Sequence, residues 1–272
     1  MKRSTISKDS IRRSFSRSSS TYDRFSFIQD RVNQLLLDRI PDQVFESALE
    51  IGCGTGGFSR RLLKKRDIRR LFLIDISATM LLRAKNQLLP AHQGVAEFLC
   101  CDGENLAFNR GVKFDLIASA SCIHWFQAPA RSLSQIVQTR LMDGGLLACA
   151  IFGKNTLWEL ETVIQEAMGQ EITFPTKGFP CKEDLVAALK GRLRELDVET
   201  HVIKREYDSL FDLLLALKRT GTAPVTGAKP IFKTRNQILA AQERYQGRFG
   251  SVTASYEIFF VTGRAPGRGR LL

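Results

Sequence analysis

Short apolar runs alternate with amphipathic segments between residues 45 and 153. The runs have the length of buried strands, and the segments between them repeat apolar residues every three to four positions, as helices do. Strands that alternate with helices predict a parallel sheet covered on both faces, because right-handed crossovers place the helices on either side. We expect strands at 45–51, 71–75, 95–100, 114–119 and 146–152, and helices at 58–65, 78–88 and 131–140.

The alternation loosens after residue 153. The predicted fold class is α/β: a doubly wound, mostly parallel, seven-stranded sheet, with a helical lid inserted in the C-terminal half. We expect one domain over residues 1–272, made of an N-terminal basic helical cap (1–40), a cofactor-binding core (41–153), and lid, substrate elements and final strands (154–272). The elements expected beyond 153 are a helix at 156–168, a lid at 170–191, a strand at 201–207, a helix at 209–219, a loop at 220–233, a helix at 236–246 and a strand at 256–262.

The formal net charge of +12 is concentrated at the two ends of the chain. Residues 1–24 hold seven Lys or Arg against two Asp, and residues 201–272 hold twelve against five Asp or Glu, so the centre is neutral. Basic ends predict an anionic partner, either nucleic acid or an acidic protein, or else a basic solubilising surface.

Composition bears on membrane association, metal binding and the cellular compartment. No run approaches the ~18 apolar residues of a membrane span. The six cysteines form no C-x-x-C pair, and no His stands at zinc-ligand spacing from them, so we expect reduced core residues and no metal site. The sequence predicts a cytoplasmic protein without membrane association. A transit peptide would share the basic, Ser-rich start, but Asp9 counts against that reading.

A glycine-rich turn between the first expected strand and helix is the main candidate site. Glycines at 52, 54 and 56 allow a sharp turn and close approach of the backbone to a ligand. The turn alone serves a dinucleotide equally well. Three carboxylates favour another ligand: Glu50 can bind an ammonium group, Asp75 ribose hydroxyls, and Asp102 an adenine amino group. An amino acid, a ribose and an adenine in series make S-adenosylmethionine.

With these residues the chain resembles class I methyltransferases over nearly its whole length. Phe114-Asp115-Leu116-Ile117 resembles their fourth-strand motif, and residues 141–145 resemble the turn before their fifth strand, with Asp143 in place of the usual Pro. The resemblance implies S-adenosylmethionine as the cofactor. The cofactor-binding residues that we expect are Glu50, Gly52, Cys53, Gly54, Gly56, Asp75, Ile76, Asp102, Gly103 and Ser119.

Three segments resemble the malonyl-acyl-carrier-protein O-methyltransferases of biotin synthesis. Residues 15–23 resemble an N-terminal F-x-R-A-A-x-x-Y-D pattern, and residues 119–126 an S-N-x-x-x-Q-W segment in which His124 replaces Gln and Ala120 replaces Asn. Residues 152–160 resemble F-G-x-x-T-L-x-E-L, the most specific match. The resemblance implies esterification of the malonyl carboxylate, with Tyr22 and His124 as catalytic residues. Tyr22 could instead pack as an ordinary helix residue, and His124 as a neutral ring beside Trp125.

The implied partner is an acyl carrier protein that carries a malonyl thioester. Carrier proteins are acidic, so Lys and Arg within 1–24 and 201–235 are expected to form the docking surface, with no nucleic-acid partner. The sequence leaves the oligomeric state open and favours a monomer. Lys177 and Lys182 in the expected lid are further candidates to contact the substrate carboxylate. The alternatives are a methyltransferase for a small acid such as trans-aconitate or for a quinone precursor, and a methyltransferase-like assembly or regulatory protein.

Overall fold

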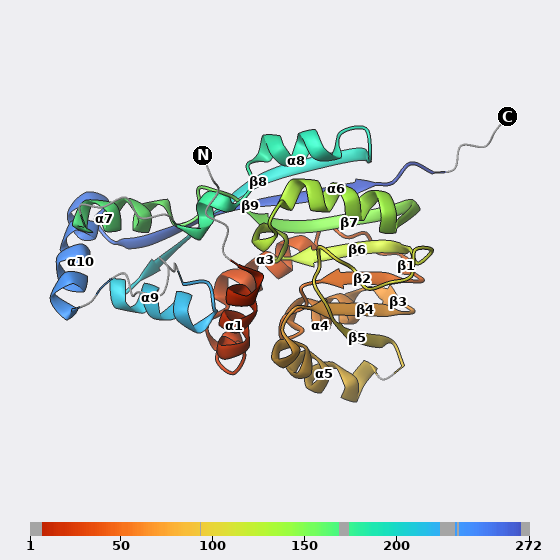
Figure 1. Ribbon diagram of the computed structural model, residues 1–272, viewed down its shortest axis with the longest axis horizontal. Helices are drawn as coiled ribbons and strands as arrows, with labels where there is room; N and C mark the ends of the chain where they lie inside the picture. The colour runs from red at the N-terminus through yellow and green to blue at the C-terminus, as the bar shows by residue number, and fades with distance from the viewer. Residues whose placement is uncertain (1–6, 93, 169–173, 224–231, 233, 268–272) are drawn as a thin grey trace.

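A computed structural model describes residues 7–92, 94–168, 174–223, 232 and 234–267 of the chain. Its centre is a seven-stranded sheet with the order β5-β4-β2-β6-β7-β9-β8 (Figure 1). Only β9 runs antiparallel to its neighbours, so the predicted mostly parallel, doubly wound sheet is confirmed. The strands are β2 (Ala48–Ile51), β4 (Leu71–Asp75), β5 (Ala96–Cys100), β6 (Phe114–Ala120), β7 (Leu141–Phe152), β8 (Arg194–Tyr207) and β9 (Val252–Arg264).

The first expected strand is divided in two. β1 (Val44–Phe45) pairs with β3 (Asp67–Ile68) in a small parallel sheet, and β2 begins only at Ala48. The backbone N–H groups of Glu46 and Ser47 donate to the Asp115 carboxylate at 2.7 and 3.1 Å, instead of continuing a strand ladder. A side chain from the neighbouring strand therefore ends the ladder, which the hydrophobic pattern of 45–51 does not reveal.

Two apolar layers cover the sheet. Side chains alternate along each strand, so Ala48 and Leu49 on β2 belong to opposite layers. One layer holds α3 (Phe27–Leu37), α4 (Gly57–Lys65) and α5 (Ala78–His92), and the other holds α6 (Pro129–Arg140) and α8 (Lys182–Leu189). α8 lies in the region expected as a lid, but its Leu185 and Leu189 are fully buried against the sheet layer.

Three helices of the C-terminal half form a helical lobe at one end of the sheet: α7 (Trp158–Met168), α9 (Leu210–Arg219) and α10 (Arg235–Phe249). They lie beside the ends of β8 and β9 (Figure 1). Each of the last two helices begins at a side-chain cap: Ser209 accepts from the Asp212 backbone, and Thr234 accepts from the Gln237 backbone. Of the loop expected at 220–233, only 220–223 and 232 belong to the described residues, and 170–173 of the expected lid lie outside them too.

The N-terminal segment crosses the carboxyl ends of the strands. α1 (Lys8–Ser18), capped by Ser7, lies between α5 and α9, and α2 (Tyr22–Phe25) leads into α3 (Figure 1). The Ser16 and Ser77 hydroxyls are 2.9 Å apart, and the Ser14 hydroxyl donates to the Gly221 carbonyl at 2.9 Å. α1 therefore joins the helical lobe to the cofactor-binding half of the sheet. No helix within the described part of the chain is long and apolar enough to cross a membrane.

The helical lobe is fixed to β9 by a buried carboxylate. Glu159 on α7 is 4% exposed and accepts hydrogen bonds from the backbone N–H of Ser255 at 3.0 Å and from the Ser255 hydroxyl. We expect Glu159→Ala to lower the free energy of unfolding by about 2–3 kcal/mol, because two buried donors lose their acceptor. Urea unfolding measures this, with the exposed Glu206→Ala as the control. Equal stabilities for the two variants would contradict the role assigned to Glu159.

Candidate functional site

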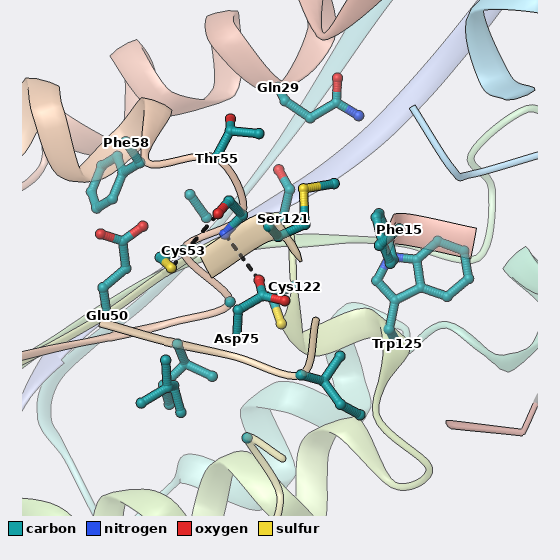
Figure 2. A pocket seen from close by; sticks show the side chains of 18 of the residues that line it. Phe15, Gln29, Glu50, Cys53, Thr55, Phe58, Asp75, Ser121, Cys122 and Trp125 are labelled. Carbon is teal, nitrogen blue, oxygen red and sulfur yellow. Dashed lines mark hydrogen bonds between the residues drawn. The ribbon is translucent and has the colours of Figure 1, made fainter. Parts of the chain in front are cut away.

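A cleft of about 1040 Å³ lies at the carboxyl ends of β2, β4, β5 and β6. The crossovers of a doubly wound sheet leave such a cleft where the strand order reverses. α1 and α2 form its other wall. Figure 2 shows Glu50 and Cys53 on one side of this cleft, and Phe15 and Trp125 on the other.

The glycine-rich turn adopts a conformation that side chains disfavour. Gly52, Gly54 and Gly56 have φ values of 75°, 55° and 87°, in the left-handed region. A Cβ on Gly52 would lie 2.3 Å from the Cys122 Sγ, and one on Gly56 would lie 3.2 Å from the Cα of Ala84. Gly52 and Gly54 line the cleft, whereas Gly56 lets the turn enter α4 close to α5.

Asp75 ties the turn to the end of β4. Its Oδ2 accepts from the Gly54 backbone N–H at 2.9 Å, and its Oδ1 accepts from that of Ser77 at 2.8 Å. Burial raises the pKa of this carboxyl to about 6, and the two hydrogen bonds oppose that rise. Each carboxylate oxygen has capacity for a second donor, so ribose hydroxyls can still bind.

Glu50 is a buried carboxyl without a charge partner. It is 1% exposed on β2, and its Oε2 has no hydrogen-bond partner. Burial raises its pKa to about 7, with the Ser59 hydroxyl opposing and the charge of Asp75 adding to that rise. A ligand that brings a cation relieves this unfavourable burial, and the ammonium group of an amino-acid moiety fits.

Asp102 lines the cleft together with Lys8, a residue that was expected in the docking surface and not in the cleft. Lys8 on α1 donates to Asp102 and lies 2.7 Å from a Glu104 oxygen. Burial acts to raise the pKa of Asp102, but hydrogen bonds from Lys8 and from the Glu104 backbone outweigh it and hold the pKa below its usual value. Only its place at the start of an amphipathic helix could have marked Lys8.

The other expected cofactor residues divide between the cleft and the core. Cys53, Ile76 and Gly103 line the cleft. Ser119 does not line it: its side chain is fully buried, and its hydroxyl donates to the Ile51 carbonyl at 2.9 Å. Ser119 therefore lies beneath the turn and supports β2, while the residues after it on β6 reach the cleft.

Asp23 on α2 fastens the N-terminal segment over the turn. It accepts from the Thr55 hydroxyl and from the Gln87 amide at 3.0 Å. Sequence reasoning did not assign a function to Asp23 or Thr55, although both stand in motifs that it singled out. Their contact explains how α2 brings Tyr22 to the cleft.

A second cavity, of about 560 Å³, adjoins the cleft. Five residues line both spaces: Phe15, Tyr22, Gln29, Ser121 and Trp125. The rest of its wall comes from the turn after β6, the end of β7, the loop before α7, the segment around Thr176, the end of α9, and β9: His124, Phe152, Thr156, Leu157, Phe174, Pro175, Thr176, Phe179, Leu217, Thr222 and Tyr256. We call it the acceptor cavity, because a molecule in it faces the ligand of the cleft across the shared residues.

His124 lies in the wall of the acceptor cavity as a neutral ring. Burial lowers its pKa to about 3. The backbone N–H of Phe152 donates to Nδ1 at 3.4 Å, so the proton resides on Nε2. Its ring centroid lies 4.6 Å from that of Phe179 and 4.9 Å from that of Phe152. The structure thus places His124 as an aromatic packing residue with one N–H available.

Tyr22 stands where the two cavities meet. Burial, followed by the charge of Asp75, raises the pKa of its phenol, so the hydroxyl keeps its proton and can donate.

The two lysines of the expected lid do not lie near Tyr22 in the cavity wall. Lys177 pairs with the buried Glu161 at 3.0 Å, and Lys182 is exposed at the start of α8. Neither Lys177 nor Lys182 lines the acceptor cavity.

The raised pKa of Glu50 predicts a pH-dependent affinity for S-adenosylmethionine. Only the ionised carboxylate pairs with an ammonium group, so we expect tighter binding as the pH rises from about 5.5 to about 7.5, through the pKa of about 7. Glu50→Gln should weaken binding about tenfold at the upper pH and leave the smaller dependence due to Asp75. Calorimetry checks both, with the exposed Glu97→Gln as the control. Identical pH profiles for wild type and Glu50→Gln would contradict this.

Comparison with known proteins agrees with the geometry of the cleft. Residues 49–149 match a methyltransferase domain. The chain is 31% identical to the malonyl-[acyl-carrier protein] O-methyltransferase of Haemophilus ducreyi, over 92% of this chain and 93% of that protein. It is 29% identical to malonyl-[acyl-carrier protein] O-methyltransferase 2 of Ilyobacter polytropus, over 95% of this chain and 99% of that protein. It is also 30% identical to the human mitochondrial arginine-hydroxylase NDUFAF5, over 88% of this chain and 70% of that protein.

Solved structures share the fold. The YcgJ protein of Bacillus subtilis superposes with a TM-score of 0.61 at 13% identity, covering 87% of this chain and 98% of that one. A methyltransferase-like structure from Bacillus halodurans gives 0.59 at 15% identity, covering 86% and 98%. The described residues contain no group of three or more His, Cys, Asp or Glu that could hold a metal ion. The chain therefore belongs to the class I methyltransferase family that contains the malonyl-[acyl-carrier protein] O-methyltransferases, and its cofactor is S-adenosylmethionine.

Proposed function

We propose that the protein esterifies the free carboxylate of a malonyl group carried on an acyl carrier protein. The observation that carries this proposal is the composition of the acceptor cavity. The two segments that most resemble the malonyl-carrier methyltransferases, 119–126 and 152–160, contribute Ser121, His124 and Trp125, and Phe152, Thr156 and Leu157, to its wall. The resemblance is therefore concentrated where a substrate would bind, and not only around the cofactor.

Contacts with β9 explain several of the residues in the motif at 152–160. A Cβ on Gly153 would lie 2.1 Å from Oε2 of Glu257 and 2.7 Å from Cε2 of Phe259, so a larger residue there would have to displace both side chains. The Glu257 backbone N–H donates to the Thr156 hydroxyl at 3.2 Å, and the Leu157 backbone N–H donates to the Ser255 carbonyl at 2.7 Å. These bonds hold Leu157 at a φ of 61°, an uncommon value for a branched side chain, and turn it into the cavity.

Esterification needs little acid–base chemistry from the protein. The bound cofactor supplies an activated methyl group. A malonyl carboxylate is ionised at neutral pH, since carboxyl pKa values lie near ~4, and it needs no general base. The chain's task is to hold the carboxylate in line with the methyl group and to exclude water. The aromatic rings around His124 exclude water, and the protonated Tyr22 can orient the carboxylate.

The outer surface next to the acceptor cavity is basic. Arg13 and Arg17 on α1, and Lys218 and Arg219 on α9, are exposed, and we call them the α1/α9 patch. The two helices are joined there, because the Thr21 hydroxyl donates to the Arg219 carbonyl at 3.0 Å. On their inner side, Phe15 and Leu217 line the cavity. An acidic carrier docked on this patch would present its acyl arm to the cavity mouth. Lys229 and Lys233 of the expected docking surface lie outside the described residues.

The central experiment is methyl transfer from labelled cofactor, with malonyl-carrier protein, malonyl-CoA, trans-aconitate and a quinone precursor as acceptors. The proposal expects rapid transfer to malonyl-carrier protein. Preferred transfer to another acceptor would overturn it. The similarity to the arginine-hydroxylase NDUFAF5 favours a second candidate, a protein that acts on arginine. An arginine-containing protein that co-purifies with the chain and gains mass in its presence would support that alternative.

Reversing charge on the α1/α9 patch should weaken the carrier interaction alone. We expect Lys218→Glu with Arg219→Glu to raise the KM for malonyl-carrier protein about tenfold at low salt, with little change in kcat. Lys64→Glu with Lys65→Glu is the matched control, because this pair also occupies the last turn of an exposed helix end, that of α4. An unchanged KM, or an equal increase in the control, would rule out the patch as the docking surface.

Changes at the junction of the cavities should separate turnover from cofactor binding. Tyr22→Phe keeps the ring and removes one donor, and we expect it to lower kcat by about tenfold or more while leaving cofactor affinity unchanged. His124→Ala should also lower turnover more than cofactor binding, because it opens the aromatic wall. Steady-state kinetics and calorimetry measure the two effects. Parallel losses of turnover and cofactor affinity would indicate that these residues only support the fold.

A further inference from the structure

The described wall of the acceptor cavity offers no protein cation to a negatively charged substrate. Among the described residues that line it, none is Lys, Arg, Asp or Glu. The one titratable ring, His124, is neutral because burial lowers its pKa to about 3. Lys8, the cation of the neighbouring cleft, is engaged by Asp102 and Glu104. The described wall of the acceptor cavity therefore offers a carboxylate neutral donors only.

Three of the six hydroxyls on the described cavity wall already have partners, and a fourth is the protonated hydroxyl of Tyr22 at the border with the cleft. The Thr156 hydroxyl is bonded to the Glu257 backbone, the Thr222 hydroxyl lies 2.9 Å from that of Thr220, and the Tyr256 hydroxyl lies 2.9 Å from that of Tyr207. Two are different. The Ser121 Oγ and the Thr176 Oγ1 are buried and have no hydrogen-bond partner. Thr176 as a whole is 4% exposed. Buried hydroxyls without partners are rare and unfavourable, which points to a ligand that satisfies them.

Ser121 is also held in an uncommon backbone conformation. Its φ is 62°, in the left-handed region, where few residues other than Gly, Asn and Asp are found. The backbone N–H of Ser121 donates to the Ala150 carbonyl at 3.0 Å, which fixes this turn at the end of β6. Strained residues of this kind cluster at functional sites. Ser121 lines both cavities, and Figure 2 shows it in the region between Asp75 and Trp125.

We infer that Ser121 and Thr176 hold the substrate carboxylate by hydrogen bonds, and that the positive charge opposite this carboxylate comes from the bound cofactor, since the described wall of the cavity supplies none. The inference rests on the proposed function and names the groups that recognise its substrate. Hydroxyls can donate to a carboxylate before methyl transfer and to the neutral ester after it. A buried lysine or arginine would be left without a partner once the carboxylate charge disappeared, which would oppose product formation.

The first test measures binding without turnover. Calorimetry with malonyl-carrier protein is run on protein saturated with sinefungin, which carries an amine in place of the sulfonium, or with neutral S-adenosylhomocysteine. We expect malonyl-carrier protein to bind at least tenfold tighter to the sinefungin complex. Isovaleryl-carrier protein, an uncharged isostere of the malonyl group, should bind both complexes equally. Equal affinity of malonyl-carrier protein for the two complexes would overturn the assignment of the positive charge.

The second test removes the hydroxyls. In the sinefungin complex, Ser121→Ala and Thr176→Val should each weaken malonyl-carrier binding about ten- to hundredfold, with isovaleryl-carrier binding unchanged. Thr176→Ser should restore most of the affinity. The free variants should melt no lower than wild type, because each loses a buried hydroxyl that had no partner. Variants that bind malonyl-carrier protein as wild type does, or that lose both carriers equally, would overturn the inference.

Failure of the proposed function is recognised separately. If wild type methylates another carboxylic acid and not malonyl-carrier protein, the proposed substrate is wrong. The same comparison of that acid with its uncharged isostere, in the same variants, then decides whether Ser121 and Thr176 recognise a carboxylate. Equal losses for the acid and its isostere would overturn the inference in that case too.

Discussion

The site depends on the carboxylate of Asp75, which joins the glycine-rich turn to the end of β4. By accepting from Gly54 and Ser77 with separate oxygens, it holds two backbone segments that follow different strands. The turn can then keep three left-handed glycines in place. Asp23 adds a second tie through Thr55, so the N-terminal segment covers a turn that is already fixed. The position of Tyr22, and with it the border between the two cavities, follows from this pair of contacts.

The two cavities differ in the charge of the side chains that line them. The cofactor cleft presents buried carboxyls, among them Glu50 with an unpartnered oxygen, and so favours a ligand that brings a cation. The described wall of the acceptor cavity presents hydroxyls and aromatic rings. One bound cofactor would supply a positive charge to each cavity: its ammonium group would pair with Glu50, and its sulfonium group would face the acceptor. Methyl transfer to a carboxylate removes one positive and one negative charge together, so a wall of neutral donors remains suited to the products.

The cofactor half could be predicted from the sequence because its residues are contiguous or follow successive strands. Glu50, Asp75 and Asp102 each stand at a strand end that the hydrophobic pattern locates, and parallel strands bring such ends together. The acceptor cavity could not be assembled in this way. Its wall is drawn from segments as distant as Phe15, Thr176 and Tyr256, and its key property, a hydroxyl without a partner, exists only once the neighbours are known. The break between β1 and β2 escaped prediction for the same reason, because Asp115 causes it from another strand.

β8 and β9 continue beyond the end of β7 as a paired antiparallel ribbon that carries the helical lobe. Residues at the far end of this ribbon meet the cavity through Tyr256, and the lobe meets it through Leu217. The wall of the acceptor cavity therefore depends on the course of this ribbon, so that residues of β8, none of which is among the described lining residues, support the cavity from outside it.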